Sequence, residues 1–591
     1  MSALPISEAI IRHKSNASSY SRGEDYYRRG AVYDVKKRGN SLQASVEGSE
    51  IKPYRVSVNF DAGGVTLACC SCLYNYDGWC KHIVATLLTC TRASNAITER
   101  LTLEQLLDNL DHLQTQRLVQ ELLRKNPELI DDIDTFVSLL NSPPSNKKSP
   151  PSKRRSQIDV TPIRSQVRRI LRDGLRELEY GSEEDPFTEE LTAIIEQAQE
   201  FALQSDGTSA IAILEAITST YAEEWDELAE YGGDCYSIAE PLNIAWTEAI
   251  LCEDIPEAQA TDLQVMLESW QDEIAADFCM SLEALKQGWN YEPLQQIMAG
   301  NNSVTLWQED TRPDFADDLI SIRLDFLERQ NRYPEYLNLA FAEGMTQQYL
   351  TKLAALGRID EAMSAAKTQM DNAETAFALA MVLRDDGYLS EALGIARSGL
   401  HLDGNCTYEF ATWTSDFAGG MGDTSTALNA SMVAFEAKPS FRDYQKVENL
   451  AADAWSQIKP DLLEILRESR HWYVTEAKVD IFLHEEFIDE AIATVSSNSY
   501  YASELLERVM DAAIPHRPDW VITKARQLAE DIMNRGKADR YDNAVRWLKK
   551  VKAAYVQLGK QSEWSAYRAE LENIHGRKRK LMELFKGLNK V

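Results

Sequence analysis

The N-terminal part of the chain changes its hydrophobic period twice. Residues 1–30 follow a helical period, and residues 32–68 then alternate apolar with polar positions. Alternation with period two puts every second side chain on the same face of a β-strand, so we expect a small sheet with one buried face. A helical period returns at His82. The pattern therefore predicts an α+β module over residues 1–95 and a helical extension over residues 96–140.

The remainder of the chain is separated from this part by a segment that cannot bury a core. Residues 141–157 consist of prolines, serines, asparagines and basic residues, with no large apolar side chain, which is typical of a linker. Beyond it, nearly every segment has an amphipathic helical period and strand patterns are essentially absent. We therefore expect a mainly α chain, with a helical domain over residues 158–345 and helical repeats over residues 346–591.

A weak internal repeat supports the assignment of the last region. A turn segment, in most copies containing glycine, is followed by an alanine, and this pattern occurs at residues 356–362, 386–392, 421–427 and 485–491. Glycine suits the turn between two helices, and the small alanine lets the helices pack closely. The spacing resembles that of tetratricopeptide (TPR) hairpins, whose period is about 34 residues. We interpret the region as a TPR-like α-solenoid; an irregular helical bundle is the alternative.

Five of the nine cysteines gather within residues 69–90. Residues i and i+2 of an extended segment point to the same side, so Cys70 and Cys72 present two thiolates together. On a regular helix Cys80 and His82 would lie about 200° apart, so Cys80 must precede the helix and His82 must lie in its first turn. Three thiolates and one imidazole suit tetrahedral Zn²⁺.

Four protein ligands leave no coordination position for water. We therefore expect one structural Zn²⁺ and no hydrolytic chemistry at it. Cys69 stands beside Cys70, which leaves open which member of the doublet binds; we favour Cys70. The alternative for the whole cluster is a set of buried reduced thiols with a capping histidine. Cys90, on the following apolar helix, is interpreted as a core thiol.

The ligand spacing C-x-C-x7-C-x-H resembles the SWIM zinc finger. Upstream, residues 23–32 have the pattern G-x-x-Y-Y-x-x-G-x-V that precedes the core in long prokaryotic members, and an apolar helix follows the histidine. The resemblance covers about residues 20–91. It implies that the same four residues are the zinc ligands, and that the module contacts DNA or another protein.

Charge divides the chain as the hydrophobic pattern does. The chain has 93 acidic and 62 basic residues, a net charge of −31. Residues 1–176 contain 26 bases and 19 acids, whereas the rest contains 36 bases and 74 acids. Excess negative charge opposes nonspecific binding to nucleic acid, so only the N-terminal part is expected to approach a polyanion.

Clustered bases near Tyr26 and Tyr27 favour nucleic-acid binding, because cations contact phosphates and aromatic rings stack on unpaired bases. The candidate residues are Arg28, Arg29, Lys36, Lys37, Arg38, Lys81, Lys153, Arg154 and Arg155. Alternatively, the tyrosines belong to the core, and the last three bases form a solvated linker or a nuclear import signal. Arg164, Arg168 and Arg172 form a row on one helix face, which is expected either to meet nucleic acid or to pair with acidic helices in cis.

Common catalytic motifs are absent: the sequence has no phosphate loop, no G-x-S-x-G turn and no H-E-x-x-H pair. We therefore expect no enzyme but an adaptor, whose zinc module binds DNA or a nucleoprotein and whose acidic repeats recruit a protein. The alternative is a scaffold that contacts only proteins. No secretory signal or membrane-spanning stretch is evident, so we expect a cytoplasmic protein, or a nuclear one in a eukaryote. The sequence leaves the partner and oligomeric state open.

Overall fold

The computed structural model describes most of the chain. The described residues are 6–48, 52–74, 78–93, 96–108, 110–125, 159–179, 187–230, 236–253, 255–274, 276–496 and 503–589. They divide into two compact units, one of residues 1–113 with 393–591 and one of residues 114–392. The predicted linker lies outside the described residues, and the domain boundaries stay predictions. No helix in the described part is long and apolar enough to cross a membrane.

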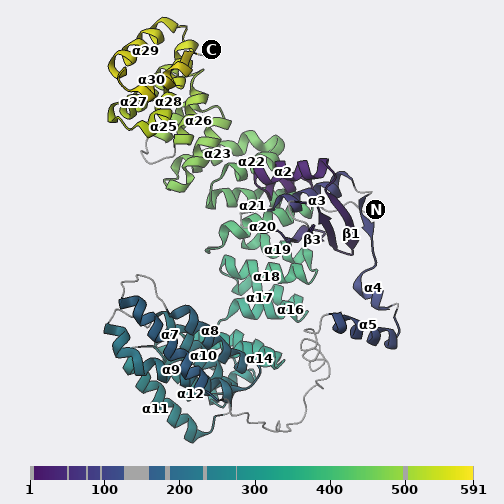
Figure 1. The fold of residues 1–591 in the computed structure, drawn as a ribbon. Helices are drawn as coiled ribbons and strands as arrows, with labels where there is room; N and C mark the ends of the chain where they lie inside the picture. Colours follow the sequence, from purple (N-terminus) through teal and green to yellow (C-terminus); the bar gives the residue numbers. More distant parts are fainter. Residues whose placement is uncertain are drawn as a thin grey trace. The chain divides into compact units, whose positions relative to one another are not determined.

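The N-terminal module combines helices α1, α2 and α3 with a five-stranded sheet (Figure 1). Its strands lie in the order β4-β3-β2-β1-β5, with antiparallel neighbours except for the parallel pair β1 and β5. The elements from the module onward are α1 (Glu8–His13), α2 (Ala17–Arg28), β1 (Val32–Arg38), β2 (Ser41–Val46), β3 (Tyr54–Asp61), β4 (Gly64–Cys70), α3 (Lys81–Arg92), β5 (Thr98–Glu99), α4 (Leu103–Asp108) and α5 (His112–Lys125).

The buried face of the sheet arises from the period-two pattern. Along β3, alternate side chains from Tyr54 to Phe60 are buried, and the β3–β4 hairpin closes where Asp61 pairs with Gly64. Helix α3 packs on this face and α2 packs on α3. A Cβ atom on Gly23 of α2 would lie 2.5 Å from Val84 of α3, so glycine permits this close approach. The hairpin and the flanking helices confirm the predicted α+β module.

Residues 159–399 are helical wherever they form regular structure. The elements are α7 (Thr161–Glu179), α8 (Thr188–Leu203), α9 (Gly207–Glu230), α10 (Tyr236–Cys252), α11 (Glu257–Ile274), α12 (Cys279–Gln287), α13 (Glu292–Met298), η2 (Glu309–Thr311), α14 (Ala316–Arg329), α15 (Tyr333–Ala342), α16 (Thr346–Ala355), α17 (Ile359–Gln369), α18 (Ala373–Asp385) and α19 (Leu389–Gly399). Arg168 of α7 pairs with Glu223 of the neighbouring helix α9 at 2.7 Å. Pairing of the arginine row with the acidic solenoid stays a prediction.

The C-terminal region continues as helices. They are α20 (Thr407–Gly420), α21 (Thr424–Ala437), α22 (Phe441–Ala451), η3 (Ala452–Ala454), α23 (Trp455–Glu468), η4 (Trp472–Val474), α24 (Thr475–His484), α25 (Ile488–Ser496), α26 (Ser503–Ala513), α27 (Pro518–Arg535), η5 (Ala538–Arg540), α28 (Tyr541–Gln557), α29 (Gln561–His575), α30 (Arg579–Lys586) and η6 (Gly587–Asn589). Successive helices pack on one another, so the region is consistent with the predicted solenoid-like arrangement.

The internal repeat has the physical basis expected from the sequence. Turn glycines between paired helices have positive φ angles, for example +73° at Gly357 and +82° at Gly422, a conformation that glycine adopts without steric cost. The repeated alanines are fully buried: Ala362, Ala392, Ala427 and Ala491. In the fourth copy Glu486, with φ of +60°, takes the place of glycine.

Two arginines of the residue 114–392 unit differ in how their charge is compensated. Arg323 of α14 has no exposed surface, and its Nε and Nη1 atoms have no hydrogen-bond partner among the described residues. Burial lowers the pKa of Arg323 to about 10. Arg312, in contrast, donates to the Glu343 carboxylate at 3.1 Å, and that side chain is only 1% exposed.

This difference predicts opposite effects of removing the two charges. Arg323→Met is expected to raise the free energy of unfolding by up to about 4 kcal/mol, because the buried guanidinium forms no ion pair among the described residues. It has only a long hydrogen bond from Nη2 to the Gly288 carbonyl, at 3.4 Å, and the longer-range attraction of Glu283 and Glu343. Arg312→Met is expected to lower it by about 3–5 kcal/mol, because the buried Glu343 loses its cation. Thermal and denaturant unfolding of the full chain measure both effects. A lower melting temperature for Arg323→Met would contradict the first expectation.

Candidate metal centre

The two halves of the predicted ligand set come from two different elements. Cys70 is the last residue of β4, and Cys72 follows in the bend beyond it. Cys80 is the N-cap residue of α3, and His82 lies in the first turn of that helix. The predicted position of Cys80 before the helix is therefore confirmed. Because α3 packs on the sheet, the end of β4 and the start of α3 are held side by side.

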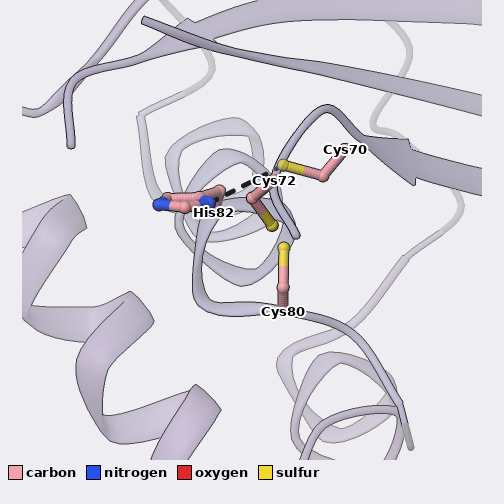
Figure 2. Close-up of side chains that lie close together, drawn as sticks. All are labelled: Cys70, Cys72, Cys80 and His82. Atoms are coloured by element: carbon pink, nitrogen blue, oxygen red, sulfur yellow. Dashed lines mark hydrogen bonds between the residues drawn. The ribbon is translucent and has the colours of Figure 1, made fainter. Parts of the chain in front are cut away.

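The four side chains converge (Figure 2). One ligand atom from each of Cys70, Cys72, Cys80 and His82 lies within 4.8 Å of the other three. The His82 Nδ1 atom lies 3.6 Å from the Cys70 sulfur and so faces the thiols. Cys80 and His82 are 4% and 2% exposed, and the other two cysteines are partly buried. Three sulfurs and one imidazole nitrogen in this arrangement fit one tetrahedral Zn²⁺.

The thiols also share protons unequally. A hydrogen bond from Cys70 and a further one from His82 lower the pKa of Cys80, despite the opposing effect of burial. The same hydrogen bond to Cys80, together with burial, raises the pKa of Cys70. Burial is the main cause of the raised pKa of Cys72. One sulfur is therefore favoured as a thiolate, and a soft cation would replace the protons of the other two.

Aromatic rings fix the orientation of His82. The Tyr54 ring stacks on the imidazole with 4.1 Å between ring centroids. The Tyr26 ring meets the imidazole edge-on, with 5.4 Å between centroids. The Nε2 atom is buried without a hydrogen-bond partner among the described residues. These contacts leave the imidazole oriented with Nδ1 toward the sulfurs.

The structure also distinguishes among the neighbouring cysteines and aromatic residues. Cys69 is exposed and is not part of the cluster, so Cys70 is the member of the doublet that faces the other ligands. Cys90 is 3% exposed in the core beneath the sheet, and burial raises its pKa to about 12, as expected for a core thiol. Tyr26, Tyr27 and Trp79 are partly buried and pack against the module core, which favours the structural interpretation of these rings.

Comparison with protein families agrees with this geometry. Residues 54–90 match the family model of the SWIM zinc finger. The N-terminal module carries a SWIM zinc finger. The matched residues run from the start of β3 to the buried face of α3, so they include all four ligands of the cluster. The resemblance noted from ligand spacing is therefore confirmed for this part of the chain.

The described residues contain one further group with metal-binding side chains, Glu448, His484 and Glu485. Its members are already paired with protein groups. Glu485 accepts a hydrogen bond from the Tyr444 hydroxyl at 2.8 Å and forms an ion pair with Lys459. His484 lies 3.2 Å from Glu448. An ammonium group within the cluster opposes a second cation, so the SWIM cluster is the one whose donor set fits a metal.

The predicted nucleic-acid residues lie in different environments. Arg29 and Lys81 lie over the Tyr26 ring, at 3.8 and 5.1 Å from its centroid. Arg28 pairs with Glu24 and Asp25 in the same helix. On β1, Lys36 pairs with Asp34, Lys37 lies over the Phe60 ring and Arg38 donates to the Leu101 carbonyl. Lys153, Arg154 and Arg155 lie outside the described residues.

Arg22 also belongs to the bases that the sequence clusters near Tyr26 and Tyr27. It lines a cavity together with Lys81 and three of the zinc ligands. The helical period of α2 places residue 22 near the side of residues 26 and 29.

We predict that replacing a ligand removes the metal, whereas replacing its neighbour does not. Cys80→Ser and Cys70→Ser are expected to lose the single zinc and to lower the melting temperature of the module, because so small a core depends on the metal. Cys69→Ser is the matched control and should keep both. Elemental analysis of zinc per chain and thermal melting measure the two properties. A Cys80→Ser protein with normal zinc content and melting would show that the ligand assignment is wrong.

Proposed function

We propose that the protein is a non-catalytic adaptor whose SWIM zinc finger binds nucleic acid or a nucleoprotein partner. The helical repeats would recruit a protein. The proposal of nucleic-acid binding rests on a cluster of three cations near the zinc ligands, Arg22, Arg29 and Lys81. This cluster occurs in a chain whose net charge is −31. A locally positive surface on an acidic chain indicates a specific place for a polyanion.

The cation cluster lies beside a cavity of about 240 Å³. Its lining includes Arg22, Lys81, Tyr54 and Tyr74, and Leu73 lies at its edge with 94% of its surface exposed. Arginine and lysine contact phosphate oxygens. Tyr54 is buried and stacks on His82, so the less buried Tyr74 is the lining ring that would contact an unpaired base. The combination of charged and aromatic lining supports a nucleotide as the bound unit.

Lys81, the first residue of α3, adds to this positive surface. Burial raises the pKa of Tyr26, but Lys81 and Arg29 outweigh this effect and lower it, which reports their positive field.

The proposal that the helical repeats recruit a protein rests on their charge. Residues 177–591 contain 74 acidic and 36 basic residues, so a basic protein surface is the partner that this region would attract. Stacked helical hairpins commonly present an extended surface to peptides or domains. A highly acidic surface without a partner, as in proteins adapted to salt, is the alternative for this region.

A protein-only scaffold is the second candidate for the zinc finger. Leu73 and Leu67 are 94% and 54% exposed, and exposed apolar side chains favour contact with protein. Phosphate contacts make DNA binding depend steeply on salt, whereas an apolar contact does not. Salt dependence therefore separates the two functions.

We predict that the full chain binds short single- or double-stranded DNA with an affinity that falls steeply between roughly 50 and 200 mM salt. The triple variant Arg22→Ala, Arg29→Ala and Lys81→Ala should lose about one unit of the log–log salt slope for each cation that contacts phosphate. Fluorescence polarisation at several salt concentrations measures the slope.

The matched control removes the same charge from another face of the module. Lys36→Ala, Lys37→Ala and Arg38→Ala on β1 should change the slope little, because none of these cations lines the cavity beside the zinc ligands. Equal losses in both triple variants would contradict the proposed location. Absence of binding to either DNA at low ionic strength would reject the nucleic-acid function in favour of the scaffold.

A further inference from the structure

The corner between α1 and α2 contacts the loop that carries the zinc ligands. The backbone N–H of Trp79, next to Cys80, donates to the Lys14 carbonyl at 2.7 Å. Asn16 donates to the Tyr74 hydroxyl at 2.8 Å, and that hydroxyl lies 3.0 Å from the Ser19 hydroxyl. Tyr74 and Trp79 flank the loop between Cys72 and Cys80. The corner and the described ends of the ligand loop are therefore held to each other by hydrogen bonds.

The opposite side of the same corner lies against α20 and α22. The Lys14 ammonium pairs with Asp416 of α20, which also pairs with Lys446 of α22 at 2.7 Å. Burial would raise the pKa of Asp416, but the two ammonium groups outweigh it and lower the pKa, so the carboxylate stays ionised. The Lys14 and Asp416 side chains are 33% and 19% exposed, so salt screens this ion pair in part.

A histidine–aspartate contact lies beside this ion pair; burial lowers the pKa of His13, which favours the neutral imidazole. His13 Nε2 is 3.7 Å from the Asp443 carboxylate, whose side chain is 4% exposed. Asp443 also accepts hydrogen bonds from the Ser440 and Tyr408 hydroxyls, at 2.6 and 3.1 Å. The corner thus meets a preformed acidic site made by two helices of the repeat region.

The β3–β4 hairpin makes an independent contact with α20. A Cβ atom on Gly420, the last residue of α20, would lie 1.9 Å from the Gly63 carbonyl oxygen. A Cβ atom on Gly63 would lie 2.4 Å from the Phe417 ring. Two glycines therefore meet backbone to backbone, although glycine in a helix costs about 1 kcal/mol relative to alanine. Strand β4 runs from this hairpin to Cys70.

We propose that zinc binding holds the SWIM finger docked on α20 and α22, so that metal occupancy controls whether the finger and the repeats act as one unit. Zinc would fix the ligand loop, the loop would position the α1–α2 corner, and the corner would present Lys14 to Asp416. Loss of zinc would free the loop and release the corner, while Asp416 keeps Lys446. Contacts within the residue 1–113 and 393–591 unit carry this inference.

Two adjacent glycines provide a matched test of the coupling. Gly420→Ala is expected to displace the hairpin and to lower zinc affinity about tenfold, because coupling between two equilibria is reciprocal. Gly419→Ala is the control, because its Cβ would meet only Ala427 at 3.9 Å. Both changes make the same difference to helix propensity. Competition of the full chain with a chelator for Zn²⁺ measures the affinity.

Lys14→Met tests the same coupling without altering α20, since Asp416 retains Lys446. It should also lower zinc affinity and raise hydrogen exchange in residues 407–420 and 441–451. Exchange in α27 and α28, which pack on each other further along the repeat region, should not change. Wild-type affinity in both Gly420→Ala and Lys14→Met would overturn the proposal while leaving the zinc site itself intact.

Hydrogen exchange of the wild-type chain with and without a chelator tests whether zinc binding affects the contact with α20 and α22. Removal of zinc is expected to increase exchange in α20 and α22 as well as in the module. Unchanged protection of α20 and α22 after zinc removal would overturn the proposal.

Discussion

Four ligand atoms from the two ends of one loop lie within 4.8 Å of one another. Their position links the sheet, at the end of β4, to helix α3, which packs on it. Cys70 ends β4 and Cys80 starts α3, so a shared cation would fasten strand to helix through two short contacts. The module core has few fully buried side chains, and small modules of this kind gain much of their stability from the metal. The cation cluster and the contact with the repeats are both built on elements that the ligands position.

Charged side chains lie on two sides of the loop that carries the zinc ligands. Arg22 and Lys81 line the cavity beside the ligands, Arg29 lies over the Tyr26 ring, and Lys14 pairs with the carboxylate of Asp416. The zinc finger thus has one cationic surface and one surface that contacts an acidic part of its own chain. In the proposed function, this division would let an acidic protein combine a nucleic-acid surface with a protein-recruiting one.

Local periodicity predicted much of what the structure contains. The strand alternation over residues 54–60, the hairpin after it and the start of α3 between Cys80 and His82 are all determined by neighbouring residues. The repeated turns and buried alanines were predictable for the same reason. The ligand set was predictable because metal geometry restricts spacing.

Features that depend on distant residues were not predictable. Strand β5 has two residues, too few for a period, and forms by pairing with β1 some 60 positions earlier. The contact between Gly63 and Gly420 joins residues far apart in the chain, and neither glycine has a local pattern that indicates it. The arginine and lysine residues near Tyr26 could be grouped from the sequence. Which of them face the cavity depended on the packing of α2 against α3.

Zinc-edge X-ray absorption spectroscopy of the purified full chain tests the central claim most directly, because it reports the identity and number of atoms bound to the metal. Three sulfur atoms at about 2.3 Å and one nitrogen at about 2.0–2.1 Å are expected in the first coordination shell. A shell with oxygen ligands, or with four sulfurs and no nitrogen, would contradict the assignment of Cys70, Cys72, Cys80 and His82.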